Sequence, residues 1–470
     1  MIPLTLAEVA EAVHGQLAGA DPAAVVSGPV VVDSREVAAG SLFVAMIGEH
    51  TDGHEHVTDA LQRGATAALV ARPVTGAAVV VTDPAAALGL LATAVLRRTT
   101  TCDVVGITGS SGKTSTKDLV AAVLSRHGET VAPPGSFNNE IGLPLTALRV
   151  TEQTRHLVLE YSTRGLGHIA YLTGIAQPSV AVVLNVGSAH LSELGSREAI
   201  ATAKGELVEA LPGDGLAVLC ADDDLVMSMR ARTAAPVIRF GRHRDAEVRI
   251  EELELDDAAH PSFRLVTPWG DADVRLGLTG AHNAGNAAAA AAVGLHAGLS
   301  LDAVVAALAE ARPVSAHRMQ VGRRDDGLVV IDDAYNANPE SMRTGIDALQ
   351  RLADGRRGRS WAVVGEMREL GPDSGELHRE VGRYAAVAGV DVILGVGAGG
   401  STIVEGASEQ LGGAQRAETV ADVAAAVAML TAELDADDTV LVKASNALGL
   451  WTVAEALLSG HARTPARSGR

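Results

Sequence analysis

Aromatic residues are scarce in this 470-residue sequence, where Phe, Tyr and Trp together make up 2% of the chain. Hydrophobic residues still reach 47% and charged residues 20%, which is typical of a globular protein and excludes a disordered chain. The core must therefore be built from Ala, Val and Leu. At roughly 150 residues per domain, the length predicts about three domains.

Basic residues are also in short supply. The 38 Lys and Arg residues are outnumbered by 57 Asp and Glu residues, which gives a formal net charge of −19. Nucleic acid and anionic membranes both require a basic face, so the charge excludes them as the main partner. Small anionic ligands are compatible with it, because they need only a few local cations and backbone amides.

The sequence has two cysteines and no long apolar run. Cys102 and Cys220 lack metal-ligand spacing, so we expect two reduced, buried thiols rather than a disulfide. The start of the chain carries Glu8 and Glu11 and does not resemble a signal peptide. We therefore expect a cytoplasmic protein with no membrane span.

Short β-branched runs alternate with longer stretches rich in Ala and Leu, a pattern typical of βα units around parallel sheets. The fold class is therefore α/β. The expected strands are Val30–Val32, Val104–Ile107, Leu157–Leu159, Val180–Leu184, Leu328–Ile331, Ala362–Val364, Val392–Val396 and Val440–Val442. The expected helices include residues 85–97, 114–126 and 196–211.

Two domain boundaries are predicted. One lies near residue 98, where an Ala-rich helix ends before a new strand, and the other near residue 313, where Pro313 follows another Ala-rich helix. Neither is a Gly/Ser linker, so we expect short connections. The predicted domains are residues 1–98, 99–313 and 314–470.

The clearest motif is VVGITGSSGKTST (104–116), in which an apolar strand runs into a Gly-rich turn and then a helix. This context directs backbone N–H groups at phosphate oxygens. Lys113 would supply a cation for the β- and γ-phosphates, and the Thr114 hydroxyl would ligate Mg²⁺. The alternative, a Ser-rich cap beside a surface lysine, does not fit the strand–turn–helix context. The candidate ATP-binding residues are Thr108, Gly109, Ser110, Ser111, Gly112, Lys113 and Thr114.

Further candidates follow the predicted strands. Glu160 lies at a carboxyl end, where ligands of α/β sheets bind, and is either a Mg²⁺ ligand or a solvated acid. His190 follows the strand at 180–184 and either faces the same crevice or is structural. Lys204 lies on or beside the apolar face of its helix, where a lysine must snorkel, pair with an acid such as Glu206, or take part in chemistry.

Two polar segments lie further along the chain. In GAHNAGN (280–286), Asn283 and Asn286 share one face of a helix, although asparagines at a helix start are usually caps. Asp332 and Asp333 end a strand and lead into a polar loop at 333–341, which is either a substrate loop or a turn.

Together these motifs resemble those of the Mur ligases, ATP-dependent amide-forming enzymes of peptidoglycan synthesis. Residues 33–70 resemble the family's UDP-sugar-binding domain, and TGSSGKTST, FNNEIGLPLT (137–146) and residues 184–207 resemble its central ATPase domain. GAHNAGN resembles the adenine-side helix. DDAYNANPESM (332–342) and VVGEMRELGPDSGELHREVG (363–382) resemble the branch that adds D-alanyl-D-alanine.

The resemblance implies three α/β domains: an N-terminal UDP-sugar-binding domain, a central P-loop ATPase domain with a mostly parallel sheet, and a C-terminal Rossmann-like domain. It implies an ATP-dependent ligase that adds D-alanyl-D-alanine to UDP-N-acetylmuramoyl-tripeptide through an acyl phosphate and releases ADP and phosphate. We expect it to act as a monomer. The implied cofactors are one or two Mg²⁺ ions.

The resemblance also implies roles for residues around the nucleotide. Lys113, Thr114 and Glu160 would hold the phosphates and the first Mg²⁺, and His190 a second Mg²⁺. Lys204 lies 14 residues after His190, as does a lysine that is often carbamylated in the family, which makes a carbamylated Lys204 a further metal ligand. The catalytic candidates are Lys113, His190 and Lys204.

Other roles are implied for residues on both sides of the nucleotide. Asn283 would contact adenine, and Arg318 and Asp333 would reach the phosphates and ribose from the third domain. The substrate-binding residues would be Ser34 and Arg35 for UDP, Asn138 and Asn139 for the muramyl peptide, and Asn336, Asn338 and Pro339 for the dipeptide.

The sequence departs from the family pattern at three places. EYSTRG (160–165) replaces an EMGA-like sequence, His317 stands where Gly usually precedes the Arg, and VKASN (442–446) replaces Val-Lys-Gly-Ser-Arg. A ligase resembling folylpolyglutamate synthase is one alternative, against which the UDP-sugar-like segment argues. A non-catalytic ATP-binding regulator is another, and it would not need Lys113, Glu160, His190 and Lys204 together. The base that deprotonates the amine is His190 or the substrate phosphate.

Overall fold

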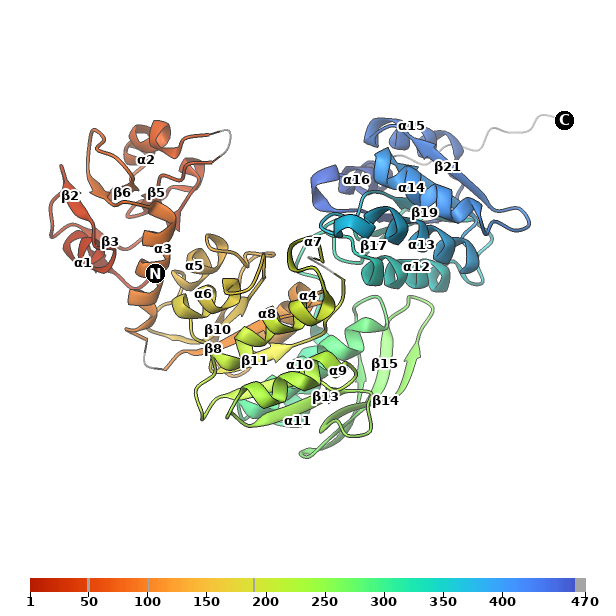
Figure 1. The fold of residues 1–470 in the computed structure, drawn as a ribbon, viewed down its shortest axis with the longest axis horizontal. Helices are drawn as coiled ribbons and strands as arrows, with labels where there is room; N and C mark the ends of the chain where they lie inside the picture. Colours follow the sequence, from red (N-terminus) through yellow and green to blue (C-terminus); the bar gives the residue numbers. More distant parts are fainter. Residues whose placement is uncertain (49–50, 100, 189–190, 461–470) are drawn as a thin grey trace.

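The computed structural model describes residues 1–48, 51–99, 101–188 and 191–460. Its ribbon proceeds along the molecule in sequence order, from the N-terminal strands at one end, through the yellow and green central part, to the blue C-terminal part at the other end (Figure 1). Each large sheet is built from one continuous stretch of chain. The exact boundaries at residues 98 and 313 stay predictions.

The N-terminal sheet has the order β2-β7-β6-β5-β4 and is parallel except for β2. A separate antiparallel pair joins β1 and β3. The strands are β1 (Leu4–Thr5), β2 (Gln16–Ala18), β3 (Val25–Val26), β4 (Val30–Val31), β5 (Leu42–Val44), β6 (Ala67–Val70) and β7 (Ala78–Val80). The helices are α1 (Leu6–Ala12), α2 (Val57–Gln62) and α3 (Pro84–Leu96).

The central sheet has nine strands in the order β16-β15-β14-β13-β12-β11-β8-β10-β9. They are β8 (Asp103–Thr108), β9 (Glu129–Val131), β10 (Thr154–Glu160), β11 (Val180–Val183), β12 (Leu216–Cys220), β13 (Val237–Gly241), β14 (Val248–Leu255), β15 (Pro261–Thr267) and β16 (Gly270–Arg275). The pairs from β9 to β14 are parallel, whereas β14, β15 and β16 form an antiparallel extension that the sequence analysis did not predict.

Helices cover both faces of the central sheet, as a doubly wound arrangement requires. They are α4 (Lys113–Leu124), α5 (Gly142–Ala147), α6 (His168–Ile175), α7 (Leu191–Leu194), α8 (Arg197–Glu209), α9 (Asp224–Ser228), α10 (His282–His296) and α11 (Leu301–Glu310). The six alanines at 287–292 are completely buried in α10, so small side chains take the place of aromatic ones here.

The C-terminal sheet has the order β17-β18-β22-β19-β20-β21 and is parallel except for β17. Its strands are β17 (Gln320–Arg323), β18 (Val329–Asp332), β19 (Ser360–Val364), β20 (Val392–Val396), β21 (Arg416–Val420) and β22 (Thr439–Lys443). The helices are α12 (Pro339–Ala353), α13 (Ser374–Val387), α14 (Gly397–Ser408), α15 (Val423–Glu433) and α16 (Trp451–Ser459).

The predicted fold class is confirmed, and each of the strands expected from sequence is present. Helices α3, α4 and α8 confirm the expected helices 85–97, 114–126 and 196–211. Cys102 and Cys220 are free thiols but only partly buried, and burial raises the pKa of each to about 12. No helix in the described part of the chain is long and apolar enough to cross a bilayer.

The two junctions between the sheets differ in chemistry. Helix α3 shares one apolar core with α5 and α6, in which Leu91, Leu143 and Leu172 are completely buried. Hydrogen bonds join the central and C-terminal parts, such as those from the Ser188 amide and hydroxyl to Glu340 at 3.1 and 2.9 Å. Polar contacts between domains are compatible with motion between the parts they connect.

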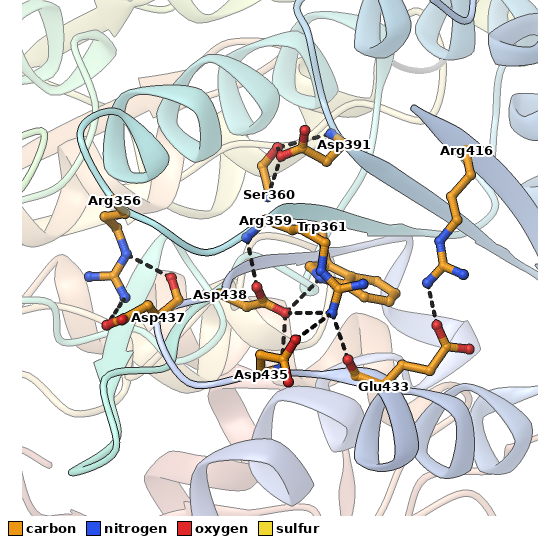
Figure 2. Close-up of polar contacts among 10 residues, drawn as sticks. All are labelled: Arg356, Arg359, Ser360, Trp361, Asp391, Arg416, Glu433, Asp435, Asp437 and Asp438. Atoms are coloured by element: carbon orange, nitrogen blue, oxygen red, sulfur yellow. Dashed lines mark hydrogen bonds and ion pairs between the residues drawn. The ribbon is translucent and has the colours of Figure 1, made fainter. Parts of the chain in front are cut away.

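A buried carboxylate organises the amino ends of β19 and β22 (Figure 2). Asp438 is 1% exposed and accepts hydrogen bonds from the backbone amides of Arg359 and Asp435, the Arg359 guanidinium and the Trp361 indole. The guanidinium carbons of Arg359 and Arg416 lie 4.9 and 5.2 Å from the centre of the Trp361 ring. The carboxylate therefore compensates several buried donors at once.

We expect Asp438→Ala to destabilise the C-terminal sheet by about 3 kcal/mol, because it leaves these donors buried without an acceptor. The urea midpoint of the transition reported by Trp fluorescence checks this. Asp435→Ala is the matched control, since that side chain is 82% exposed and its loss should leave the midpoint nearly unchanged. Equal midpoints for both variants would refute the assigned role of Asp438.

Candidate active site

A cavity of about 800 Å³ opens where the carboxyl edge of the central sheet faces the C-terminal part. Side chains from both parts line it. Of the candidate residues chosen from sequence, those lining the cavity are Ser110, Ser111, Gly112, Lys113, Thr114, Asn138, Asn139, Asn283, Arg318, Asp333, Asn336 and Asn338. Segments more than 200 residues apart in the sequence therefore meet at one cavity.

The turn between β8 and α4 is shaped to receive an anion. No side chain caps the amino end of α4, so its first amides are available to a ligand in the cavity. Gly112 has φ of +80°, and a Cβ there would lie 2.9 Å from the Asn286 Oδ1 atom. Lys113 folds back and donates to the Gly109 carbonyl at 2.6 Å. Thr108 and Gly109 come just before this turn in the sequence and do not line the cavity.

Asn185, which follows β11, holds the turn in place and was missed by the sequence analysis. Its Oδ1 atom accepts from the amides of Ser110 and Ser111, both at 3.0 Å, and its Nδ2 atom donates to the Ser111 carbonyl at 3.2 Å. These two amides therefore point at Asn185. The amides from Gly112 onward are the ones left for a phosphate.

An oxygen-rich cluster lies beside the start of α4. Thr114 Oγ1 is 2.9 Å from Ser136 Oγ, and Glu160 Oε2 is 3.4 Å from Ser136 Oγ and 3.3 Å from Asn138 Nδ2. Glu160 is completely buried, which rules out the solvated acid, and its Oε1 atom has no partner among the described residues. Hydroxyl and carboxylate oxygens with one unpaired carboxylate oxygen fit Mg²⁺, which prefers such ligands.

Two lysines lie near this cluster. Burial lowers the pKa of Lys113, an effect partly opposed by the Glu160 charge. Lys204 on α8 is 1% exposed, and burial, followed by the Lys113 charge, lowers its pKa well below the usual value. Pairing with Glu206 is wrong, because that carboxylate accepts from the amides of Gly167 and Ala170. His190 lies outside the described residues.

Asn283 and Asn286 are not helix caps. Asn286 donates to Asn283 Oδ1 at 2.9 Å and accepts from the Thr116 hydroxyl at 3.1 Å, while Asn283 donates to the Thr279 carbonyl at 2.9 Å. This buried chain ties the start of α10 to α4. It places Asn283 at the cavity wall beside the phosphate-binding turn.

The C-terminal part contributes a cation and an ion pair. The Arg318 guanidinium donates to Ser136 Oγ at 3.1 Å and lies 4.2 Å from the centre of the Tyr335 ring. Asp333 is bonded to Lys443 Nζ at 2.6 Å and accepts from the Met319 amide at 3.1 Å. Lys443 belongs to the VKASN stretch (442–446), which differs from the family pattern. It also donates to the Asn336 carbonyl at 2.9 Å.

The remaining substrate candidates are spread widely. Asn138 and Asn139 lie in the loop before α5, and Asn139 Oδ1 accepts from the Gly142 amide at 2.8 Å. Asn338 caps α12, and Pro339 opens that helix as a buried residue outside the cavity lining. Ser34 and Arg35 lie in a 3₁₀ turn of the N-terminal part, where Arg35 pairs with Asp33, and they do not line the cavity.

Matches to family models cover most of the chain. Residues 29–96 match a model described as Mur ligase family, catalytic domain, residues 107–294 match the Mur ligase middle domain, and residues 317–446 match the Mur ligase, glutamate ligase domain.

Relatives of known name match over nearly the full length. The UDP-N-acetylmuramoyl-tripeptide–D-alanyl-D-alanine ligase of Mycobacterium tuberculosis H37Rv is 47% identical over 98% of both chains. The Escherichia coli K12 ligase of the same name is 37% identical over 84% of this chain and 86% of its own.

Solved structures agree with these matches. A crystal structure of MurF from Acinetobacter baumannii superposes with a TM-score of 0.87 at 31% identity, covering 97% of this chain and 99% of that one. MurF from Thermotoga maritima in complex with ADP gives a TM-score of 0.78 at 31% identity, covering 92% and 97%.

We expect Asn185→Ala to weaken ATP binding about tenfold. The amides of Ser110 and Ser111 lose the side-chain oxygen that accepts their hydrogen bonds, so the turn is no longer held in the shape that binds the phosphates. Titration of the protein with Mg–ATP in a calorimeter measures this. Gln153→Ala, an exposed amide side chain in a distant turn, serves as control and should bind as the wild type does. Unchanged affinity in Asn185→Ala would contradict its role in shaping the turn.

Proposed function

The chain belongs to the Mur ligase family, and on that premise we propose that it joins D-alanyl-D-alanine to UDP-N-acetylmuramoyl-tripeptide at the expense of ATP. The observation that carries the proposal is 47% identity to a ligase of that name over 98% of both chains. The cavity supports it, because an uncapped helix start and cations from two parts of the chain line it, and the buried Glu160 carboxylate lies directly behind Ser136 and Asn138 of its wall.

The reaction proceeds in two steps. A carboxylate oxygen of the tripeptide attacks the γ-phosphorus of ATP, the bond to the β-phosphate oxygen breaks, and an acyl phosphate and ADP form. The amine of D-alanyl-D-alanine then attacks the acyl carbon, loses a proton, and displaces phosphate from a tetrahedral intermediate. Each step transfers charge between oxygens, so stabilisation of charge and positioning supply most of the acceleration.

The residues of the cavity divide this work. The amides at the start of α4 and the Lys113 ammonium neutralise the γ-phosphoryl oxygens as the group is transferred. Thr114 and Glu160 would hold Mg²⁺, which supplies further charge neutralisation on the phosphates when bound. Arg318 approaches the same phosphates from the opposite wall, while Asn283 faces the adenine and Asp333 the ribose. The base is His190 or the substrate phosphate.

The peptide substrates occupy the two ends of the cavity in this proposal. Asn138 and Asn139 face the muramyl peptide on the side of the N-terminal part, where Ser34 and Arg35 would bind UDP. Asn336, Asn338 and Pro339 lie on the C-terminal side, where the dipeptide enters. We propose that domains 1–98, 99–313 and 314–470 act together as a cytoplasmic monomer, in which the second and third domains line the cavity.

Lys204 has the properties of a carbamylated residue. Burial, followed by the Lys113 charge, lowers the pKa of its amine well below the usual value, which favours the neutral form. A neutral amine can attack CO₂, lose a proton and become a carbamate with one negative charge. That charge would offset Lys113 nearby and supply oxygen ligands for a second Mg²⁺ together with His190.

Omission of each substrate in turn tests the reaction itself. Phosphate release from ATP is expected only when UDP-N-acetylmuramoyl-tripeptide and D-alanyl-D-alanine are both present, because the acyl phosphate requires one and its breakdown the other. Mass spectrometry of the product should show the tripeptide substrate extended by the dipeptide. Release with either substrate omitted, or no release at all, would refute the assigned substrates, and the second result would favour a non-catalytic regulator.

Replacement of Lys204 tests its role. Replacement by Ala should lower kcat about 100-fold or more, and formate or acetate should restore part of it by returning a carboxylate to the vacated space. A ¹³C carbamate resonance is expected in wild-type protein equilibrated with ¹³CO₂. Lys117→Ala is the control, because that buried lysine already donates to the Pro133 carbonyl at 2.7 Å and should gain nothing from formate. Full activity of Lys204→Ala would contradict the assignment.

A further inference from the structure

Arg318 is flanked by two residues with left-handed backbone. His317 has φ of 59° and Met319 has φ of 50°, a region that side chains other than glycine rarely adopt. Strain of this kind persists only where the surrounding structure holds it. The segment that delivers Arg318 to the cavity is therefore fixed by contacts outside itself.

The contacts come from consecutive carboxylates at the end of β18. Asp332 Oδ2 lies 2.6 Å from His317 Nδ1, and Asp333 Oδ1 accepts from the Met319 amide at 3.1 Å. Both carboxylates are largely buried. The His317 ring also packs against Trp451, with 5.2 Å between ring centres. The imidazole is therefore held by its bond to the Asp332 carboxylate and by its contact with the indole.

The side chain between these two anchors points into the cavity. The Arg318 guanidinium donates to Ser136 Oγ, which is itself in contact with Thr114 and Glu160. The guanidinium also lies over Tyr335. The Arg318 Nε atom has no partner among the described residues, so the guanidinium retains donors for a ligand.

We propose that His317, through its bond to Asp332 and its contact with Trp451, is a positioning residue that fixes Arg318 against the ATP phosphates. The proposal rests on the ATP-dependent function proposed above. It explains why a strained histidine occupies a position that glycine would occupy without strain. Glycine would relieve the backbone but would lose the contacts of the ring with Asp332 and Trp451.

Replacement of His317 separates this role from a structural one. We expect His317→Gly to bind Mg–ATP about tenfold more weakly, because Arg318 is no longer held, without a lower melting temperature, because glycine accepts positive φ. A purely structural histidine predicts the reverse, with unchanged affinity for Mg–ATP and an altered melting temperature. Adenosine binding should be unaffected in every variant, because Arg318 acts on the phosphates.

A conservative variant and a matched control sharpen the test. His317→Asn places an amide nitrogen where the Nδ1 atom of the histidine lies and tolerates left-handed backbone, so it should bind Mg–ATP within about twofold of wild type. His14→Gly removes another histidine of positive φ (53°), exposed in the N-terminal part, and should leave Mg–ATP binding unchanged.

Asp332→Asn tests the same contact from the side of the carboxylate. It keeps the shape of the residue that bonds His317 and removes its charge. We expect about threefold weaker Mg–ATP binding, and no further loss when it is combined with His317→Gly. Wild-type affinity in His317→Gly, or equal loss in His317→Asn and His317→Gly, would overturn the proposal. Calorimetry needs no peptide substrate, so failure of the ligase assay is distinguishable from failure of this inference.

Discussion

The uncapped amino end of α4 is the feature on which the rest of the cavity depends. A helix start presents amides and a partial positive charge, and it binds an anion only when no side chain of its own satisfies those amides. Asn185 meets this condition by bonding the two amides before the helix and leaving the later ones open. Thr114, Glu160 and Arg318 are linked beside these amides through contacts with Ser136.

The junction between the N-terminal and central parts differs in chemistry from the junction between the central and C-terminal parts. The apolar core shared by α3, α5 and α6 joins the N-terminal and central parts as closely as the interior of one domain. Polar contacts attach the C-terminal part, including Ser188 with Glu340 and, at the cavity itself, Arg318 with Ser136. Contacts formed in this way are made or broken together with ligand contacts, so the occupancy of the cavity and the position of the C-terminal part are linked.

Local sequence sufficed where the structure depends on neighbours along the chain. The phosphate-binding turn, the eight strands expected from sequence and the acidic ends of β10 and β18 all follow from short motifs. Asn185 was missed because its contacts to Ser110 and Ser111 span 74 positions or more. The LNVG segment (184–187) that contains it predicts only the end of a strand. The antiparallel extension β14–β16 and the bond between His317 and Asp332 likewise depend on tertiary pairing. The placement of His190 stays a prediction.

Ala259 is completely buried in the C-terminal apolar cluster, although it belongs to the segment between β14 and β15 of the central part. Arg351 of α12 reinforces this attachment by donating to the Leu255 carbonyl at 2.8 Å. The C-terminal part is thus attached to the central part here, as well as at the covalent connection before Arg318 and at contacts such as that of Arg318 with Ser136. A movement of the C-terminal part away from the central part must therefore either break the bond between Arg351 and Leu255 or carry the segment between β14 and β15 with it.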